Sequence, residues 1–135
     1  SAKLYYTQVT AEIKGEAQAE SNYYLAHFEY VQSKYEASNE RIFWMIDNLP
    51  TYPQWRWKSL LLMAKNYAGL QDDFQANYTL DYIIDNAEGA IVGEAQQFKS
   101  DLTRRRAAEE AQAQISDTLE VAPTEMEELE ELDQE

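Results

Sequence analysis

The chain repeats itself at an interval of 38 or 39 residues, and this repeat constrains its fold more than any other feature. Three pairs of segments carry it: Leu25–Ala26 and Met63–Ala64, Lys34–Ala37 and Asp73–Ala76, and Met45–Asn48 and Ile83–Asn86. A repeat of this length is one supersecondary unit, which buries its apolar face only by stacking on a neighbouring unit. The chain is therefore predicted to be built from stacked copies of one small motif.

Within each repeat the apolar residues return every three or four positions, which is the spacing of one face of an α-helix. The stripes are Tyr24, Phe28, Val31 and Tyr35; Ile42, Met45, Ile46 and Leu49; Trp57, Leu60, Leu61 and Ala64; Ala76, Leu80, Ile83, Ile84 and Ala87; and Ile91, Ala95, Phe98 and Leu102. Short breaks at 33–37, 49–55, 69–73 and 86–90 separate them. We predict an all-α fold in which successive helices lie antiparallel, because their connections are short.

The second repeat has a small residue in its first helix and an aromatic residue just before an alanine at the start of its second. The residues are Met63-Ala64, Tyr67, Phe74-x-Ala76, Leu80 and Ile83; the first repeat has Leu25-Ala26 and Tyr35-x-Ala37. This pattern resembles the tetratricopeptide repeat (TPR) family, although Glu29 stands where the family has a tyrosine. Over residues 4–98 the chain is similar to long TPR proteins of gram-negative bacterial envelopes. The resemblance implies TPR-like antiparallel helix hairpins that form a short solenoid with a C-terminal capping helix.

The resemblance also implies where the units begin and end. We expect the second helix of a truncated preceding repeat at 1–14, TPR-like repeats at 15–53 and 54–90, a capping helix at 91–116 and an acidic tail at 117–135. The segment after residue 90 is not expected to be a third repeat. Aligning its "GEAQ" at Gly93 with the same letters at Gly15 places Arg104 where the family packs a small residue.

TPR proteins bind partners on a concave face, and the resemblance assigns seven residues to that face here. They are Glu20, Tyr23, His27 and Tyr30 in the first repeat, and Lys58, Leu61 and Lys65 in the second. Such a surface is aromatic on one repeat and cationic on the next, so it suits a peptide with an acidic group or a C-terminal carboxylate. His27 is about as well explained by a side chain that is hydrogen-bonded within the fold, or simply exposed, as by a contact with a partner.

The tail is a second candidate for binding. Residues 117–135 contain nine acids and no base, which leaves sixteen acids and all eleven bases in the rest of the chain. Composition alone predicts disorder for such a segment. However, Met126, Leu129 and Leu132 recur every three residues, so the tail also suits a short amphipathic helix that folds on a partner.

No catalytic, cofactor or metal site is predicted. The chain has no cysteine and a single histidine, which removes most zinc and hydrolytic constellations. The clustered acids Asp72, Asp73, Asp81 and Asp85 lack the spacing of a calcium loop, and we interpret them as helix caps and solvated faces. In the basic run at 104–106, Arg105 and Arg106 lie four residues before Glu109 and Glu110, so ordinary ion pairing on one helix explains the run and nucleic-acid binding is not expected.

Trp55 and Trp57 leave two interpretations open, since aromatic residues serve both cores and interfaces. Trp57 begins an apolar stripe and is predicted to be core, whereas Trp55 either packs at the junction between the repeats or is presented to a partner. No apolar run approaches the roughly 20 residues that span a bilayer, so we expect no direct membrane insertion.

Together these observations predict a non-enzymatic scaffold for protein–protein interaction. The resemblance implies a TPR module at the C-terminal end of a larger envelope-associated protein, periplasmic or outer-membrane associated, with a cytoplasmic location as the alternative. The rival hypothesis is a structural subunit of a large multiprotein assembly, docked through its convex face or its acidic tail.

Overall fold

The computed structural model describes the backbone of residues 2–133 and the side chains of residues 13–119. Its five helices are α1 (Ala2–Val31), α2 (Tyr35–Asn48), α3 (Pro53–Gly69), α4 (Asp73–Asn86) and α5 (Ala90–Asp133). Residues 2–133 contain no strand, which confirms the all-α prediction. The chain divides into two compact units, one ending at Lys99 and the other beginning at Ser100, so that α5 contributes its first turns to one unit and the rest to the other.

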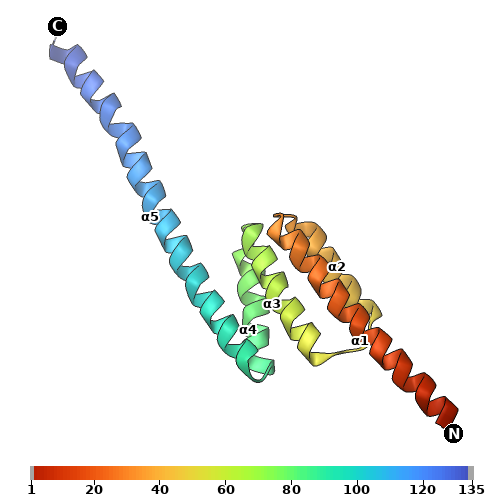
Figure 1. Cartoon of the computed structure of the whole chain (residues 1–135). Helices are drawn as coiled ribbons and strands as arrows, with labels where there is room; N and C mark the ends of the chain where they lie inside the picture. The colour runs from red at the N-terminus through yellow and green to blue at the C-terminus, as the bar shows by residue number, and fades with distance from the viewer. Residues whose placement is uncertain (1, 134–135) are drawn as a thin grey trace. The chain divides into compact units, whose positions relative to one another are not determined.

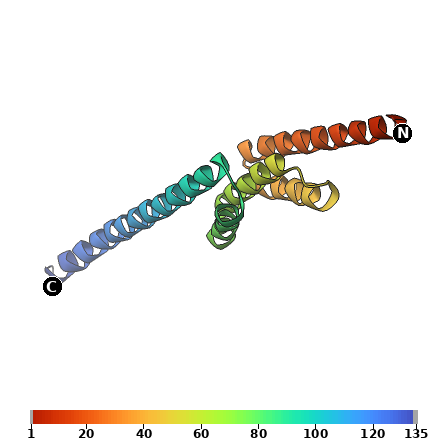
Figure 2. The same ribbon diagram turned by 90° about the horizontal axis from the view of Figure 1, so that it is seen from below.

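The first unit is built from two helical hairpins, α1–α2 and α3–α4, that pack on each other. Contacts join α1 to α2 and α3 to α4 within the hairpins, and α3 to both α1 and α2 between them. Figures 1 and 2 show that α1 and α3 form one layer of this unit, while α2 and α4 form the other. The second helices of the two hairpins match, because α2 and α4 each contain 14 residues and begin 38 residues apart.

The connections end where the sequence predicts breaks, and each has a local cause. Pro53 is the first residue of α3, a position where its missing N–H costs nothing. Ser33 and Gln71 both adopt a φ of 62° in the turns that follow α1 and α3. Asp72 then caps α4, because its Oδ1 accepts a hydrogen bond of 3.1 Å from the backbone N–H of Gln75. The cap interpretation of Asp72 is therefore confirmed.

Two glycines let aromatic side chains approach a helix backbone closely. A Cβ atom added to Gly69, the last residue of α3, would lie 2.5 Å from the ring of Tyr35 at the start of α2. A Cβ atom added to Gly15 in α1 would lie 2.3 Å from the hydroxyl oxygen of Tyr52, which precedes α3. Each contact joins one hairpin to the other, so both glycines help to hold the two hairpins together.

The core of the first unit lies between the hairpins and the first turns of α5. Its fully buried centre comprises Ala26, Ile42, Ala64, Leu80, Ile83 and Ala95, and the half-buried side chains of Ile91 and Phe98 pack against it. A second, smaller cluster contains Ala19, Met45 and Trp55. Trp55 is therefore a core residue at the junction between the hairpins, which settles its two interpretations.

The apolar stripe expected on α1 is not the face that α1 buries. Tyr24, Phe28 and Val31 are 54%, 60% and 65% exposed, whereas Ala19 and Ala26 are buried. The reason is that α1 and α2 approach closely enough for the Ser38 hydroxyl to donate a 2.7 Å hydrogen bond to the Ala26 carbonyl. Only small side chains fit between two helices at that separation.

A second expectation also fails, at the start of α4. Phe74 belongs to the TPR-like pattern with Ala76, Leu80 and Ile83, which predicts that all four help the repeats to stack, but its side chain is 77% exposed while those three are fully buried. The residue lies in the first turn of α4, one position after Asp73, and faces away from the buried side of the helix. Ala76, Leu80 and Ile83 therefore form the buried face of α4 without Phe74.

The unit boundaries expected at 14/15 and at 116/117 do not coincide with the ends of helices. α1 runs without a break through Gly15 to Val31, and α5 runs as one helix from Ala90 to Asp133. The predicted break at 86–90 is present, since α4 ends at Asn86 and α5 begins at Ala90.

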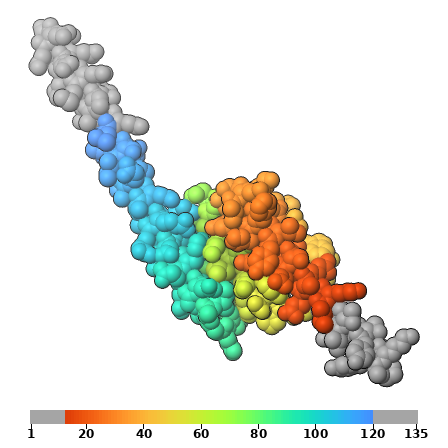
Figure 3. Space-filling view, viewed as in Figure 1, coloured from red at the N-terminus to blue at the C-terminus, as the bar shows by residue number. Residues whose placement is uncertain are grey.

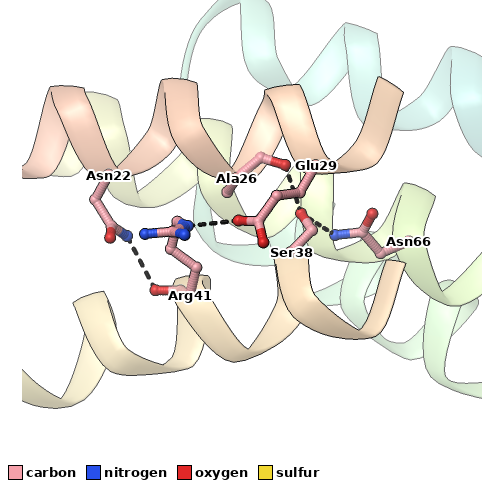
Figure 4. Close-up of polar contacts among 6 residues, drawn as sticks. All are labelled: Asn22, Ala26, Glu29, Ser38, Arg41 and Asn66. Atoms are coloured by element: carbon pink, nitrogen blue, oxygen red, sulfur yellow. Dashed lines mark hydrogen bonds and ion pairs between the residues drawn. The ribbon is translucent and has the colours of Figure 1, made fainter. Parts of the chain in front are cut away.

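Buried polar side chains connect the three helices α1, α2 and α3 (Figure 4). The Asn66 amide, fully buried in α3, donates hydrogen bonds to Ser38 Oγ at 2.7 Å and to Asn39 Oδ1 at 2.9 Å. Nearer the surface, the Asn22 amide donates to the Arg41 carbonyl at 2.9 Å, and Arg41 forms a 2.5 Å ion pair with Glu29. Because such groups must be matched when buried, this network fixes how the helices are aligned.

Candidate functional site

A hollow of about 270 Å³ opens on the layer formed by α1 and α3, within the first unit. It is lined by Tyr23, His27 and Tyr30 from α1, by Lys58, Leu61, Leu62 and Lys65 from α3, and by Ile91 and Glu94 from the first turns of α5. We call it the α1–α3 hollow. Helical geometry accounts for the lining, because residues three or four apart on one helix project from the same face.

Six of the seven residues predicted for a concave face line this hollow: Tyr23, His27, Tyr30, Lys58, Leu61 and Lys65. Glu20, the seventh, is exposed on α1 and does not line it. Leu62, Ile91 and Glu94 were missed. Ile91 belongs to an apolar stripe visible in the sequence, but no pattern in the sequence shows that the start of α5 reaches this hollow.

The α1 wall of the hollow is a row of aromatic rings. The ring centroids of Tyr23 and His27 are 6.2 Å apart, and those of His27 and Tyr30 are 6.1 Å apart. Tyr23 also contacts the buried Trp55, at 5.9 Å, and Tyr30 contacts Tyr35, at 5.9 Å. Contacts at both ends hold this wall in place. A ligand that packs against these rings would therefore lose little free energy in ordering the side chains.

Burial, and then the nearby Tyr24 and Glu94, raise the pKa of Tyr23 above its ordinary value of 10.0. Burial raises it because an anionic phenolate loses more solvation than the neutral phenol. The hydroxyl therefore stays protonated at neutral pH and can donate a hydrogen bond into the hollow. His27, by contrast, is exposed, and its ring contacts those of Tyr23 and Tyr30.

The α3 wall carries two half-buried lysines that lie over aromatic rings. Lys58 Nζ is 4.9 Å from the Trp55 ring centroid, and Lys65 Nζ is 5.8 Å from that of Phe98. Among the side chains of residues 13–119, neither ammonium forms an ion pair with a carboxylate. A cation held over a ring keeps its N–H donors free on the other side, so both lysines can bind an acceptor in the hollow.

The remaining predicted features have structural roles or lie outside the described residues. Asp81 forms a 2.5 Å ion pair with Lys99, and Arg106 pairs with Glu109 at 3.1 Å in the second unit. Within residues 13–119 no three His, Asp or Glu side chains gather as metal ligands would. The side chains of the proposed tail contacts, Met126, Leu129 and Leu132, lie outside the described residues.

No protein-family model, curated protein or solved structure matches the chain. Of the helices in the part of the chain that is described, none has the length and apolar character needed to cross a bilayer.

Proposed function

We propose that the chain is a TPR-type scaffold that binds a segment of a partner protein in the α1–α3 hollow. One observation carries the proposal: a single hollow is lined by an aromatic wall and by two lysines that pair with no carboxylate among the side chains of residues 13–119. Since the chain also resembles TPR proteins of gram-negative envelopes, the proposal extends to a module of a larger protein, periplasmic or outer-membrane associated.

The lining favours a peptide segment with a carboxylate and an adjacent apolar side chain. The carboxylate would accept a hydrogen bond from Lys58 or from Lys65, and the apolar side chain would pack against Leu61, which lies between the two lysines along α3 and is 7% exposed. Glu94 is the one acid of the lining, and it would repel a second carboxylate placed near α5. A hollow of about 270 Å³ holds only a few side chains, so we expect weak binding by this hollow alone.

A library of short peptides with free C-terminal carboxylates, presented to the full chain, tests the proposal. We expect enrichment of peptides with a carboxylate next to an apolar residue, and loss of that binding in the double variant Lys58→Glu, Lys65→Glu. Lys34→Glu, at an exposed position in the turn between α1 and α2, controls for the general effect of charge. Equal binding by the double variant and by Lys34→Glu would refute the carboxylate site.

A second candidate is docking through the layer formed by α2 and α4, as a subunit of a larger assembly. Phe74, Tyr78 and Tyr82 follow one another at four-residue intervals on α4 and are 77%, 66% and 43% exposed. Aromatic residues that remain exposed on one face of a helix are favoured contacts in interfaces. Assembly that survives alanine at all three positions, and also survives deletion of residues 117–135, would exclude this candidate.

A further inference from the structure

The two hairpins can be compared position by position, because they are equivalent at an interval of 38 residues. Ala26 and Ala64 are both fully buried, as are Ile42 and Leu80. α2 and α4 have the same length. A difference in burial between equivalent positions therefore shows where one hairpin has a neighbour and the other has none.

The face of α3 that meets the α1–α2 hairpin is formed by Ser59, Leu62, Met63 and Asn66. All four are buried, with exposures of 0%, 3%, 5% and 0%. Ser59 Oγ lies 3.8 Å from Met45 Sδ in α2, and Asn66 donates to Ser38 and Asn39 of the same helix. This face of α3 is therefore the one by which the second hairpin docks on the first.

The equivalent residues of α1, 38 positions earlier, are Ser21, Tyr24, Leu25 and Phe28. Ser21 is exposed, and the three large side chains are 54%, 51% and 60% exposed. Beside them, a hollow of about 570 Å³ between α1 and α2 is lined in part by Ser21, Leu25 and Trp44, and Trp44 is 44% exposed. We call this surface the α1 flank; it is formed by Ser21, Tyr24, Leu25, Phe28 and Trp44. Figure 3 shows the orange surface of α1 open to solvent on the viewer's side.

We propose that the α1 flank is the docking surface for a further helical hairpin built like α1–α2. The fold itself supplies the precedent, since the same face of α3 is covered by such a hairpin. The side chains agree with it, because three of the four equivalent residues on α1 are large and apolar rather than charged. This inference does not depend on the proposed function, since none of the residues of the α1 flank lines the α1–α3 hollow.

The flank also specifies the chemistry of the helix that covers it. In the existing interface the Asn66 amide satisfies Asn39 Oδ1 of the neighbouring helix. Phe28 stands at the equivalent position of α1 and has no donor to offer. A buried polar oxygen without a donor is unfavourable. The incoming helix therefore carries an apolar residue where α2 carries Asn39.

Tandem duplication tests both parts of the proposal. The test chain contains residues 1–52 followed by residues 15–135, so that a second α1–α2 hairpin precedes the original one. Its first hairpin carries Asn39→Leu, which places leucine opposite Phe28 of the second. We expect a higher Tm than that of the original chain and one cooperative transition with a larger m-value in urea, because stacked repeats stabilise one another and m grows with the surface exposed on unfolding.

Three variants of the duplicated chain sharpen the test. Phe28→Asp in the second hairpin should abolish the gain in Tm, whereas Phe74→Asp, on the exposed start of α4, should retain it. The duplicated chain that keeps Asn39 in its first hairpin should melt below the leucine version. Separate melting of the added hairpin with an unchanged Tm for the rest would overturn the docking surface. A Tm for the Asn39 version equal to or above that of the leucine version would overturn the apolar requirement.

Discussion

Replacing Asn66 by alanine should destabilise the first unit by about 2 to 3 kcal/mol. The side chain is fully buried and its amide donates to Ser38 Oγ and Asn39 Oδ1, so the substitution removes two hydrogen bonds worth about 1 kcal/mol each. Ser38 still donates to the Ala26 carbonyl, but the buried Asn39 oxygen loses its donor, which costs about 1 to 2 kcal/mol more. One term acts in the opposite direction: Asn66 Oδ1 is buried and accepts no hydrogen bond from the residues that the structure describes, so its removal returns about 1 kcal/mol.

Urea unfolding followed by circular dichroism measures this free energy, and a double-mutant cycle with Asn39→Ala isolates the contact. We expect a coupling energy of about 1 kcal/mol between positions 39 and 66, because the two side chains share one buried hydrogen bond. Asn48→Ala is the matched control, since Asn48 is exposed and its amide donates to the Trp44 carbonyl of its own helix. A loss no larger for Asn66→Ala than for Asn48→Ala, or a coupling energy of zero, would refute the view that this network aligns the helices.

Substitutions at three further sites probe other contacts of the first unit. Gly69→Ala should lower the free energy of unfolding in urea by about 1 to 3 kcal/mol, because the new Cβ would meet the Tyr35 ring. Gly93→Ala is the control: its new Cβ would meet none of the described residues within 4 Å, so it should stabilise α5 by up to about 1 kcal/mol. Equal effects of the two substitutions would contradict the close contact. Asp72→Ala should lower the stability by about 1 kcal/mol through loss of the α4 cap, with Asp72→Ser restoring most of it. The raised pKa of Tyr23 means that its contribution to stability is complete below pH 10 and is lost as the pH rises from there through the folded-state pKa. Tyr23→Phe should therefore lose less stability than the parent chain in alkaline unfolding curves, and parallel curves would contradict this.

The sequence predicts the helices and their breaks, since these depend on local spacing and on the 38-residue repeat. Pro53 and Asp72 act on the backbone next to them, so their effects can be predicted from the local sequence. Six of the nine residues that line the hollow are among those that the resemblance to the TPR family assigns to a concave face. Glu94 and Ile91 could not be found in this way, because the position of α5 depends on contacts far away in the sequence.

The burial of α1 could not be predicted from hydrophobicity. Tyr24, Phe28 and Val31 form its most apolar stripe, yet α2 packs on the opposite side, where Ala19, Asn22 and Ala26 lie. A close approach favours small residues, and it is secured by hydrogen bonds that periodicity does not reveal. The same limit applies to Asn66, a polar residue in a buried position, whose partners in α2 lie 27 and 28 residues away.

The two glycine contacts have a consequence for the order in which the unit loses structure. Tyr35 in the first hairpin lies against Gly69 in the second, and Tyr52, at the entrance to the second, lies against Gly15 in the first. Neither hairpin can open without pulling a ring from the backbone of the other. Amide hydrogens of α1 and α3 should therefore exchange with solvent in one shared opening event rather than hairpin by hairpin.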